Sequence, residues 1–359
     1  MAWGKGRKAR SLLYLAVAGV ALGGTVRPVA AARPLGDTRV FTRVPAPGQP
    51  EGLAVRGNVV YVGTHTSAVG NAGGEPSRLF RYNQATGRLI DAVTVQGQNV
   101  EAVHGLVGMS FGPDGRLYVL DRDPPRLLAF DVAVSPPAQS TFATFPALPR
   151  CSAAPSPCAP TSNPGGAFPD ALVFDAAGGA YVTDVQQATI FYVPPGGGAA
   201  SVWFQDRRLD GPFGANGIDL DPTGTRVVFA VTISNQPDTP NQGSVYSLPV
   251  GGPPAPADLT LIHRYPEPFA APDGIIYGRT GRLYVALAGA NQISVLDGSR
   301  EVARFPTAAA NARQEVPYDS PASPVFDGAG GLLVTNQSYV NGNPRSWAVL
   351  DAWVDDTAR

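Results

Sequence analysis

The sequence predicts an all-β fold, a six-bladed β-propeller with four-stranded blades, and three observations support this prediction. Glycine (42) and proline (36) are frequent among the 359 residues, while short apolar runs recur throughout, which is typical of many strands joined by turns. No segment keeps an apolar period of 3.6 residues, so long helices are not expected. A unit of about fifty residues occurs six times, which is the spacing of propeller blades.

Each unit contains two segments that we interpret as the innermost and second strands of a blade. The unit begins with the pattern x-Gly-apolar-x-apolar, continues through a Gly-rich turn, and then enters an apolar strand that usually contains Tyr-Val. One clear copy starts at Val107 and reaches its Tyr-Val pair at Tyr118. The six units begin at Glu51, Val107, Asp170, Asn216, Asp273 and Ala322.

Two further segments complete each blade. Third strands are expected at residues 78–82, 126–131, 189–193, 244–248, 292–297 and 347–351, and fourth strands that end at proline at 142–146, 262–266 and 302–306. The sixth unit lacks a fourth segment after its third strand. Residues 39–45 match that pattern, so we predict that they pair with the last strand and close the ring, since an open propeller would expose strand edges.

The first 32 residues predict a secretory signal. Basic residues, among them Lys5, Lys8 and Arg10, precede the apolar run 11–22 and a small-residue site that ends at Ala32. The run is shorter than the roughly 20 residues that span a bilayer. We therefore expect cleavage after about Ala32, a single propeller domain over residues 33–359, no stable membrane span, and a secreted, periplasmic or otherwise extracytoplasmic location. A retained N-terminal anchor is the alternative.

Charge and cysteine usage narrow the function classes. Of the 27 Lys and Arg residues, five lie in the first 32 positions, which leaves 22 against 28 Asp and Glu in the mature chain. This mildly acidic balance gives no electrostatic footprint for nucleic acid. Both lysines lie in the signal, which excludes lysine Schiff-base chemistry and a P-loop lysine. The only cysteines, Cys151 and Cys158, are expected to form a local disulfide in an exported chain.

The first positions of the units predict a metal site. Innermost strands surround the channel of a propeller, so equivalent starting positions form a ring at its mouth. Three carboxylates brought together there would repel one another unless a cation lies among them. An all-oxygen set favours one divalent ion, calcium first, with zinc, manganese and magnesium as alternatives. The competing interpretation is that Asn-Gly and Asp-Gly only form turns, but it gives no reason for Glu51. The four oxygen donors are Glu51, Asp170, Asn216 and Asp273.

These residues also carry a family resemblance. Glu51-Gly, Asn216-Gly and Asp273-Gly, each opening an inner strand in its own blade, resemble the metal-binding signature of the gluconolactonase and regucalcin (senescence-marker-protein-like) family of six-bladed propellers. The resemblance covers essentially the mature chain. It implies that Glu51, Asn216 and Asp273 bind the metal and that Asp273 also transfers a proton. It places Asp170 near the metal and substrate. Some members have a substrate-binding arginine two positions earlier, where this sequence has Phe168.

Two classes of function follow. The resemblance implies a metal-dependent hydrolase of a lactone or related small ester, in which the ion polarises the carbonyl and a carboxylate takes the proton of the attacking water. The alternative is a non-enzymatic propeller with a structural ion, which binds a small molecule or a protein at the channel mouth. A quinone-dependent dehydrogenase on a similar scaffold would need basic and histidine contacts that the sequence does not show.

Two other residues near the expected channel mouth are candidate substrate contacts. They are Phe168, which takes the place of the arginine, and His104, a loop histidine just before the second unit. A Gly-x-Ser-x-Gly match surrounds Ser110, but that serine falls inside a predicted inner strand, whereas a serine nucleophile of this type needs a strand-turn-helix elbow. We therefore do not expect a nucleophilic serine.

Overall fold

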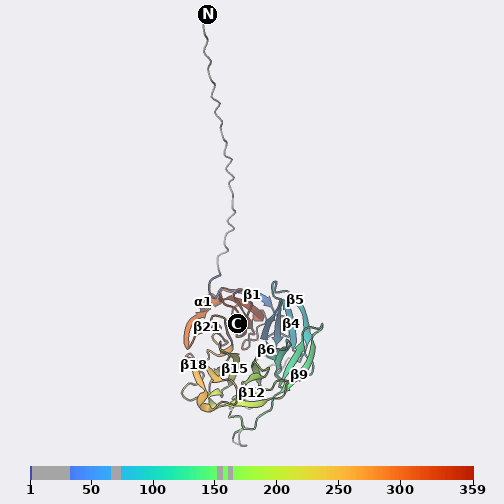
Figure 1. Cartoon of the computed structure of the whole chain (residues 1–359), viewed down its shortest axis with the longest axis vertical. Coiled ribbons are helices and arrows are strands. Elements are labelled where there is room, and N and C mark those ends of the chain that lie inside the picture. The colour runs from blue at the N-terminus through green and yellow to red at the C-terminus, as the bar shows by residue number, and fades with distance from the viewer. Residues whose placement is uncertain (2–32, 66–73, 152–156, 161–164) are drawn as a thin grey trace. The chain divides into compact units, whose positions relative to one another are not determined.

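Six sheets surround a central channel and form the blades of a β-propeller, which confirms the predicted fold class (Figure 1). All six belong to one unit of the chain, Pro34–Arg359. The computed structural model describes residues 1, 33–65, 74–151, 157–160 and 165–359. The predicted signal segment, residues 1–32, therefore lies outside the described residues apart from Met1.

Each blade contains four antiparallel strands that follow one another from the channel outward. The innermost strands are β2 (Pro50–Arg56), β6 (Leu106–Phe111), β10 (Pro169–Phe174), β15 (Phe213–Leu220), β19 (Pro272–Tyr277) and β23 (Pro321–Phe326). The second strands are β3 (Val59–Thr64), β7 (Leu117–Asp121), β11 (Ala180–Asp184), β16 (Arg226–Ile233), β20 (Leu283–Leu287) and β24 (Gly331–Asn336). The third strands are β4 (Arg78–Asn83), β8 (Arg126–Asp131), β12 (Thr189–Val193), β17 (Gly243–Pro249), β21 (Gln292–Asp297) and β25 (Ala348–Trp353). The outer strands are β5 (Leu89–Thr94), β9 (Ala138–Thr144), β14 (Ser201–Gln205), β18 (Thr260–Tyr265), β22 (Arg300–Phe305) and β1 (Thr38–Arg43).

Two outer strands were not identified by the proline-ending pattern, because neither β5 nor β14 is followed directly by proline. The outer strand of the second blade also begins at Ala138, earlier than the predicted residue 142. A two-residue strand, β13 (Gly198–Ala199), pairs with β9 in parallel and covers part of the outer edge of that blade. Covering an edge strand in this way limits its backbone pairing with strands of other chains.

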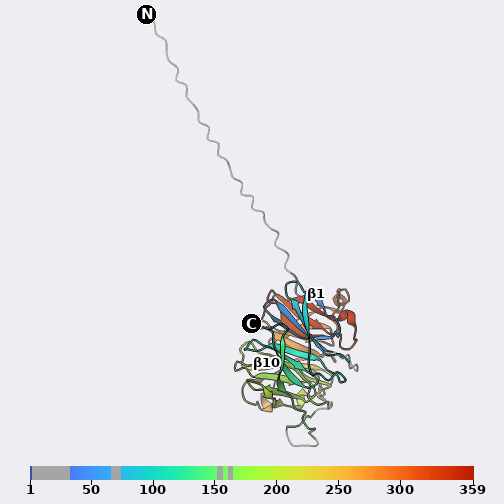
Figure 2. The ribbon, with the colours of Figure 1, turned by 90° about the vertical axis from the view of Figure 1, so that its right-hand side faces the viewer.

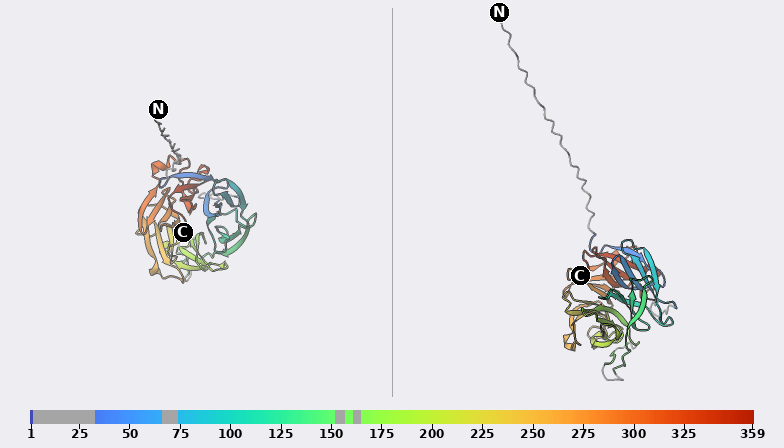
Figure 3. Two further views of the ribbon diagram at one scale, coloured as in Figure 1. Left: turned by 45° about the horizontal axis from the view of Figure 1, so that its top comes forward. Right: turned by 45° about the vertical axis from the view of Figure 1, so that its right-hand side comes forward.

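The N-terminal strand closes the ring as predicted. Strand β1 pairs with β25 in antiparallel fashion, from Thr38 opposite Ala352 to Arg43 opposite Ala348. Figure 3 shows this blue strand beside the red C-terminal strands. The sixth blade therefore combines one strand from the start of the domain with three from its end.

The repeated Tyr-Val pair has a packing role between blades. Tyr118 of β7 contacts Phe174 of β10 in the next blade, with ring centroids 4.9 Å apart. Tyr284 of β20 contacts Phe326 of β23 in the same way, at 5.5 Å. Both tyrosines are buried, and edge-to-face aromatic pairs stabilise such contacts beyond the area they bury. The apolar core thus lies mainly between neighbouring blades.

The C-terminal segment crosses the face of the ring at which the inner strands end. The Asp356 carboxylate is buried and accepts a hydrogen bond from the Tyr284 hydroxyl at 3.1 Å. The Arg359 guanidinium donates to the carbonyl oxygens of Leu220, at 2.8 Å, and Asp221, at 2.6 Å. Figure 1 places the C-terminus at the centre of the ring, and Figure 2 places it at one face. The segment therefore spans blades six to four on that face.

The remaining elements are short. They are the helix α1 (Ala308–Asn311) and three single-turn 3₁₀ helices at Arg207–Leu209, Pro256–Asp258 and Pro344–Ser346. Cys151 and Cys158 form a disulfide, with their Cα atoms 4.6 Å apart, as the sequence predicts. No helix in the described ranges is both long and apolar enough to span a membrane.

Candidate functional site

The first position of every unit lies in a β-bulge of the innermost strand. In the first blade, Pro50 is opposite Thr64 and Leu53 is opposite Val62, so Glu51 and its neighbour face a single residue of β3. The register shifts at the same place in the other five blades. A bulge bends the strand and redirects a side chain. The repeat therefore builds six equivalent positions at one end of the inner strands.

Glycine follows the first position in four of the six units, and the reason is close approach between blades. A Cβ atom on Gly217 would overlap the carbonyl oxygen of Asp273 in the next blade. A Cβ atom on Gly52 would overlap the carbonyl oxygen of Val107 in the same way. The Asn-Gly and Asp-Gly pairs are therefore parts of bulged strands in contact with their neighbours, and the turn interpretation does not describe them.

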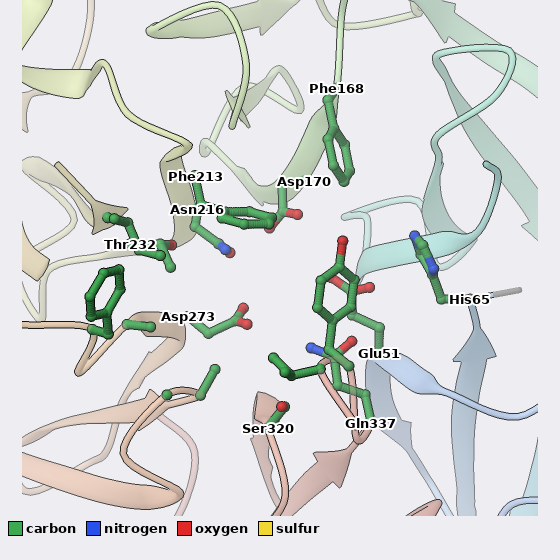
Figure 4. Close-up of a pocket in the computed structure, with 17 residues that line it drawn as sticks. Glu51, His65, Phe168, Asp170, Phe213, Asn216, Thr232, Asp273, Ser320 and Gln337 are labelled. Atoms are coloured by element: carbon green, nitrogen blue, oxygen red, sulfur yellow. The ribbon is translucent and has the colours of Figure 1, made fainter. Parts of the chain in front are cut away.

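The four oxygen-donor residues lie around one pocket. Figure 4 shows Glu51, Asp170, Asn216 and Asp273 pointing toward a common space from four blades. All four line a cavity of about 200 Å³, and each is only 6% to 8% exposed. The other two ring positions, Val107 and Ala322, are fully buried and apolar. The polar part of the ring therefore forms the floor of the pocket.

Burial raises the pKa values of the three carboxyls, and repulsion from neighbouring carboxylates adds to this effect for Glu51 and Asp170. For Glu51 the pKa rises well above its usual range because of burial, and then because of the charges of Asp170 and Asp273. Burial and the charge of Asp273 raise the pKa of Asp170 in the same way. Burial raises the pKa of Asp273 to about 7, although hydrogen bonds from the Gly274 N–H and the Asn216 amide oppose this shift. Without a cation, the floor holds protons more readily than ordinary carboxyls do.

An arginine that sequence reasoning missed lies beside the pocket, in contact with residues that line it. Arg122 follows β7 directly, and its guanidinium carbon lies 3.8 Å from the centre of the Phe168 ring. One of its nitrogens lies 3.3 Å from Nε2 of His65, and its guanidinium also hydrogen-bonds with the Tyr339 side chain. The Arg122 charge lowers the pKa of Glu51, opposing the effect of burial, while burial lowers the pKa of Arg122 itself.

The donor set fits a hard divalent cation by its chemistry. The Oδ1 atom of Asn216 is buried and has no hydrogen-bond partner, so an oxygen lone pair faces the pocket unsatisfied. When all are ionised, the three carboxylates and the guanidinium carry two net negative charges. One divalent ion neutralises this charge. Within the described ranges, however, no three His, Cys, Asp or Glu side chains are close enough together to form a metal-ligand group. The pocket thus offers the right atoms at a wider spacing than a bound ion would have.

The structure separates the two predicted substrate contacts. Phe168 lines the pocket, and its backbone N–H donates to the buried Asp184 carboxylate at 2.7 Å, which holds the loop before β10 in place. His104 does not line the pocket. It is buried, and its Nδ1 and Nε2 atoms lie 2.8 Å from the carbonyl oxygens of Ala102 and Glu75. Ser110 lies inside β6 and also outside the pocket lining.

Several pocket residues come from loops or strand ends that the repeat does not mark. His65 follows β3 and Tyr339 follows β24, whereas Phe213 and Phe269 precede the bulges of the fourth and fifth blades. For His65 the signal was available in the period, because the ends of second strands and the starts of inner strands lie at the same edge of each blade. His65 comes 14 residues after Glu51, as Asp184 does after Asp170.

Comparison with known proteins supports the fold alone. No protein-family model and no curated protein matches the chain. Regucalcin from Agrobacterium tumefaciens, described as a calcium-binding protein, has a TM-score of 0.61 at 15% identity, covering 90% of this chain and 96% of its own. A gluconolactonase from Xanthomonas campestris has a TM-score of 0.56 at 14% identity, covering 89% and 90%. A catalytically inactive virginiamycin B lyase from Staphylococcus aureus, solved with quinupristin, has a TM-score of 0.54 at 16% identity, covering 87% and 83%. Proteins with different activities therefore share this six-bladed fold.

Proposed function

We propose that the protein is a metal-dependent hydrolase that opens a lactone or a related small ester. The observation that supports this most is the convergence of three buried carboxyls and one amide, from four different blades, on a single pocket. A bound cation would compensate the repulsion among these like charges and let the carboxyls ionise. Glu51, Asp170, Asn216 and Asp273 would hold the ion, with calcium as the first choice for an all-oxygen set.

The chain's own residues supply the rest of the chemistry. A bound divalent cation would polarise the acyl carbonyl and stabilise the charge that develops on its oxygen. Asp273 lies in the floor, with the Asn216 amide hydrogen-bonded to it, and is the proposed proton acceptor. The water oxygen forms a bond to the acyl carbon, and Asp273 takes the water proton. The acyl–oxygen bond of the ring then breaks, and the same proton passes to the leaving alkoxide.

Export belongs to the same proposal. The Cys151–Cys158 disulfide supports it, because such bonds persist in oxidising compartments and are rare in the cytosol. The predicted signal and the mildly acidic mature chain agree with an extracytoplasmic enzyme that acts on a small molecule.

The test is hydrolysis by the purified mature protein of a panel of lactones and activated esters, with calcium, zinc, manganese or magnesium supplied in turn. We expect turnover that chelation abolishes. Asp273→Asn should lower kcat/KM by about 100-fold or more, because it keeps the shape and one oxygen but removes the proton acceptor. Ser110→Ala is the matched control and should retain activity within about twofold, since that hydroxyl lies in a packed strand.

A ligand-binding propeller without catalysis is the second candidate. It is favoured by the spacing of the acidic side chains, since no three of the described His, Cys, Asp and Glu residues form a metal-ligand group. Absence of turnover with all four metals would favour this candidate over the hydrolase, whereas full activity in Asp273→Asn would exclude Asp273 as the proton acceptor.

A further inference from the structure

The walls of the pocket above the carboxylates are largely apolar. Phe168, Phe213 and Tyr339 contribute aromatic rings, and Ile233 and Val340 contribute aliphatic groups. Phe213 and Tyr339 contact each other edge to face, with ring centroids 6.0 Å apart. Ligand pockets of this kind combine an apolar lining, which sets affinity, with a few polar groups that orient the reacting part.

Phe269 at the rim departs from ordinary backbone behaviour. Its φ angle is +61°, a left-handed conformation that bulky residues rarely adopt. The backbone is held there by a hydrogen bond from the Phe269 N–H to the Asn241 carbonyl oxygen at 2.8 Å. The residue is nevertheless 54% exposed, although it lines the pocket, and Val340, which also lines the pocket, is 74% exposed. A strained, solvent-exposed aromatic at the mouth of a pocket suggests a role in binding.

The charges of the pocket restrict the ligand further. Three carboxyls form the floor, and none of the described residues that line the cavity is Lys or Arg. Arg122, the nearest guanidinium, is covered by the Phe168 ring and hydrogen-bonded with Tyr339. Apart from an ion held by the floor, an anionic ligand would therefore find no Lys or Arg side chain in the described lining to pair with.

Outside the floor, the described lining has five polar residues, which are His65, Thr232, Ser320, Gln337 and Tyr339. His65 and Tyr339 already interact with Arg122, whereas Thr232 Oγ1 and Gln337 Oε1 are buried oxygens without hydrogen-bond partners. These two oxygens suffice to orient one reacting group. A sugar ring loses hydrogen bonds to water when it enters the pocket, and the apolar walls replace few of them.

We infer that the pocket selects an uncharged lactone or ester whose non-reacting part is an alkyl chain or an aryl ring, in preference to a polyhydroxylated sugar lactone or an anionic substrate. This inference rests on the proposed function for the reacting group. The apolar part would contact Phe269 and Val340 at the rim, while the acyl group lies over the acidic floor.

Binding of unreactive analogues tests the inference separately from catalysis. The probes are two δ-lactams, 2-piperidone and 6-pentyl-2-piperidone, titrated by calorimetry into the calcium-loaded mature protein. We expect the pentyl compound to bind at least about tenfold more tightly, because its chain leaves water for the apolar walls. Phe269→Asn should reduce this ratio to about two, since asparagine tolerates the left-handed conformation but lacks the ring.

The control is Leu261→Asn, which removes an apolar side chain that is 43% exposed on the outer strand β18, outside the pocket. It should leave the binding ratio unchanged. Equal or weaker binding of the pentyl compound, or a ratio that Phe269→Asn does not alter, would overturn the inference even if lactones are hydrolysed. Preferential hydrolysis of δ-gluconolactone over δ-decalactone would also overturn it, while supporting the proposed activity. Tight pentyl-selective binding without any lactone hydrolysis would contradict the proposed function alone.

Discussion

Each carboxyl in the pocket floor is shielded from water and lies near another negative charge. Glu51, Asp170 and Asp273 belong to different blades, so no local turn or cap accounts for their grouping. Burying one carboxylate costs free energy unless it is paired, and burying three near one another costs more. Arg122 offsets only part of this repulsion. A bound cation would offset the free-energy cost of burying these carboxylates.

The raised pKa values predict how the metal-free protein responds to pH. The folded-state pKa of Asp273 is about 7, above its ordinary value of 3.8, so the folded protein binds protons more readily than the unfolded chain. Its contribution to stability is therefore complete below about pH 4 and is lost as the pH rises through about 7. In a chelator, urea unfolding should show a loss on the order of 2 to 4 kcal/mol between pH 5 and pH 8.

Asp273→Asn is the control for this titration, because the amide keeps the shape and does not ionise. Its unfolding free energy should fall less steeply over the same range. Excess calcium should also flatten the wild-type profile, because the ion competes with protons for the carboxylates. A metal-free stability that rises from pH 5 to pH 8, or identical slopes in the two proteins, would show that the floor does not titrate as described.

At this scale the sequence predicted the floor better than the walls. Glu51, Asp170, Asn216 and Asp273 occupy equivalent positions of a repeat, and a closed ring must bring such positions together. The stacking of Arg122 on Phe168 joins residues from neighbouring blades that share no repeat position. Loop conformations place Phe269 and Tyr339, and no periodic signal encodes those conformations.

Among the structural elements, the bulged inner strand is the one that builds the site. Every blade has two residues opposite one at the same register, and the first of the two is the ring position. In the blades in which glycine does not follow the ring position, a threonine of the second strand contacts the bulge. Thr335 Oγ1, for example, accepts from the Ser323 N–H at 2.9 Å and lies 2.8 Å from the Glu51 carbonyl oxygen, to which it donates. The bulge therefore also connects the sixth blade to the first.

A substitution in one bulge tests this role. Gly217→Ala places a methyl group against the Asp273 carbonyl oxygen, so the fourth and fifth blades must move apart locally. We expect a loss of about 1 to 3 kcal/mol in unfolding free energy, the usual cost of overpacking. Weaker calcium binding should accompany it, because Asn216 and Asp273 both shift.

Gly252→Ala is the matched control, because that glycine has open space around its Cβ position and no left-handed backbone. Its effect on urea unfolding should stay within about 0.5 kcal/mol. Equal stability of the two variants would mean that the close approach between blades is not required.

The elements themselves were largely predictable, because alternating apolar patterns and glycine turns mark strand positions. The bulge was not, because it depends on the pairing of two strands, and a one-residue change in register is invisible in a single segment. The outer strands β5 and β14 were missed for a related reason. Their residues are mostly exposed or half-buried, so burial imposes little pattern on them.

Across the whole molecule, the two ends of the inner strands have different surroundings. The pocket opens where the inner strands begin, whereas the C-terminal segment crosses where they end, with Arg359 bonded to Leu220 and Asp221. Strand β1 closes the ring. A rigid closed ring holds side chains from four blades in fixed relation, which a site assembled across blades requires.

The fold alone does not determine the activity, because similar six-bladed propellers include a calcium-binding protein, a gluconolactonase and a lyase. The pocket of this chain has an acidic floor and aromatic side chains in its walls, and its described lining contains no Lys or Arg. The proposed hydrolysis requires that the floor bind a cation.

Calorimetric titration of calcium into the metal-free mature protein at pH 7.5 tests that claim most directly. We predict one bound ion per chain, an affinity at least about tenfold lower in Asp170→Asn and in Glu51→Gln, and proton release that varies with the buffer. Asp206→Asn, which changes a carboxylate outside the pocket lining, should bind calcium as the wild type does. Absence of binding with calcium, zinc, manganese and magnesium, or equal affinity in the wild type and both floor variants, would contradict the account.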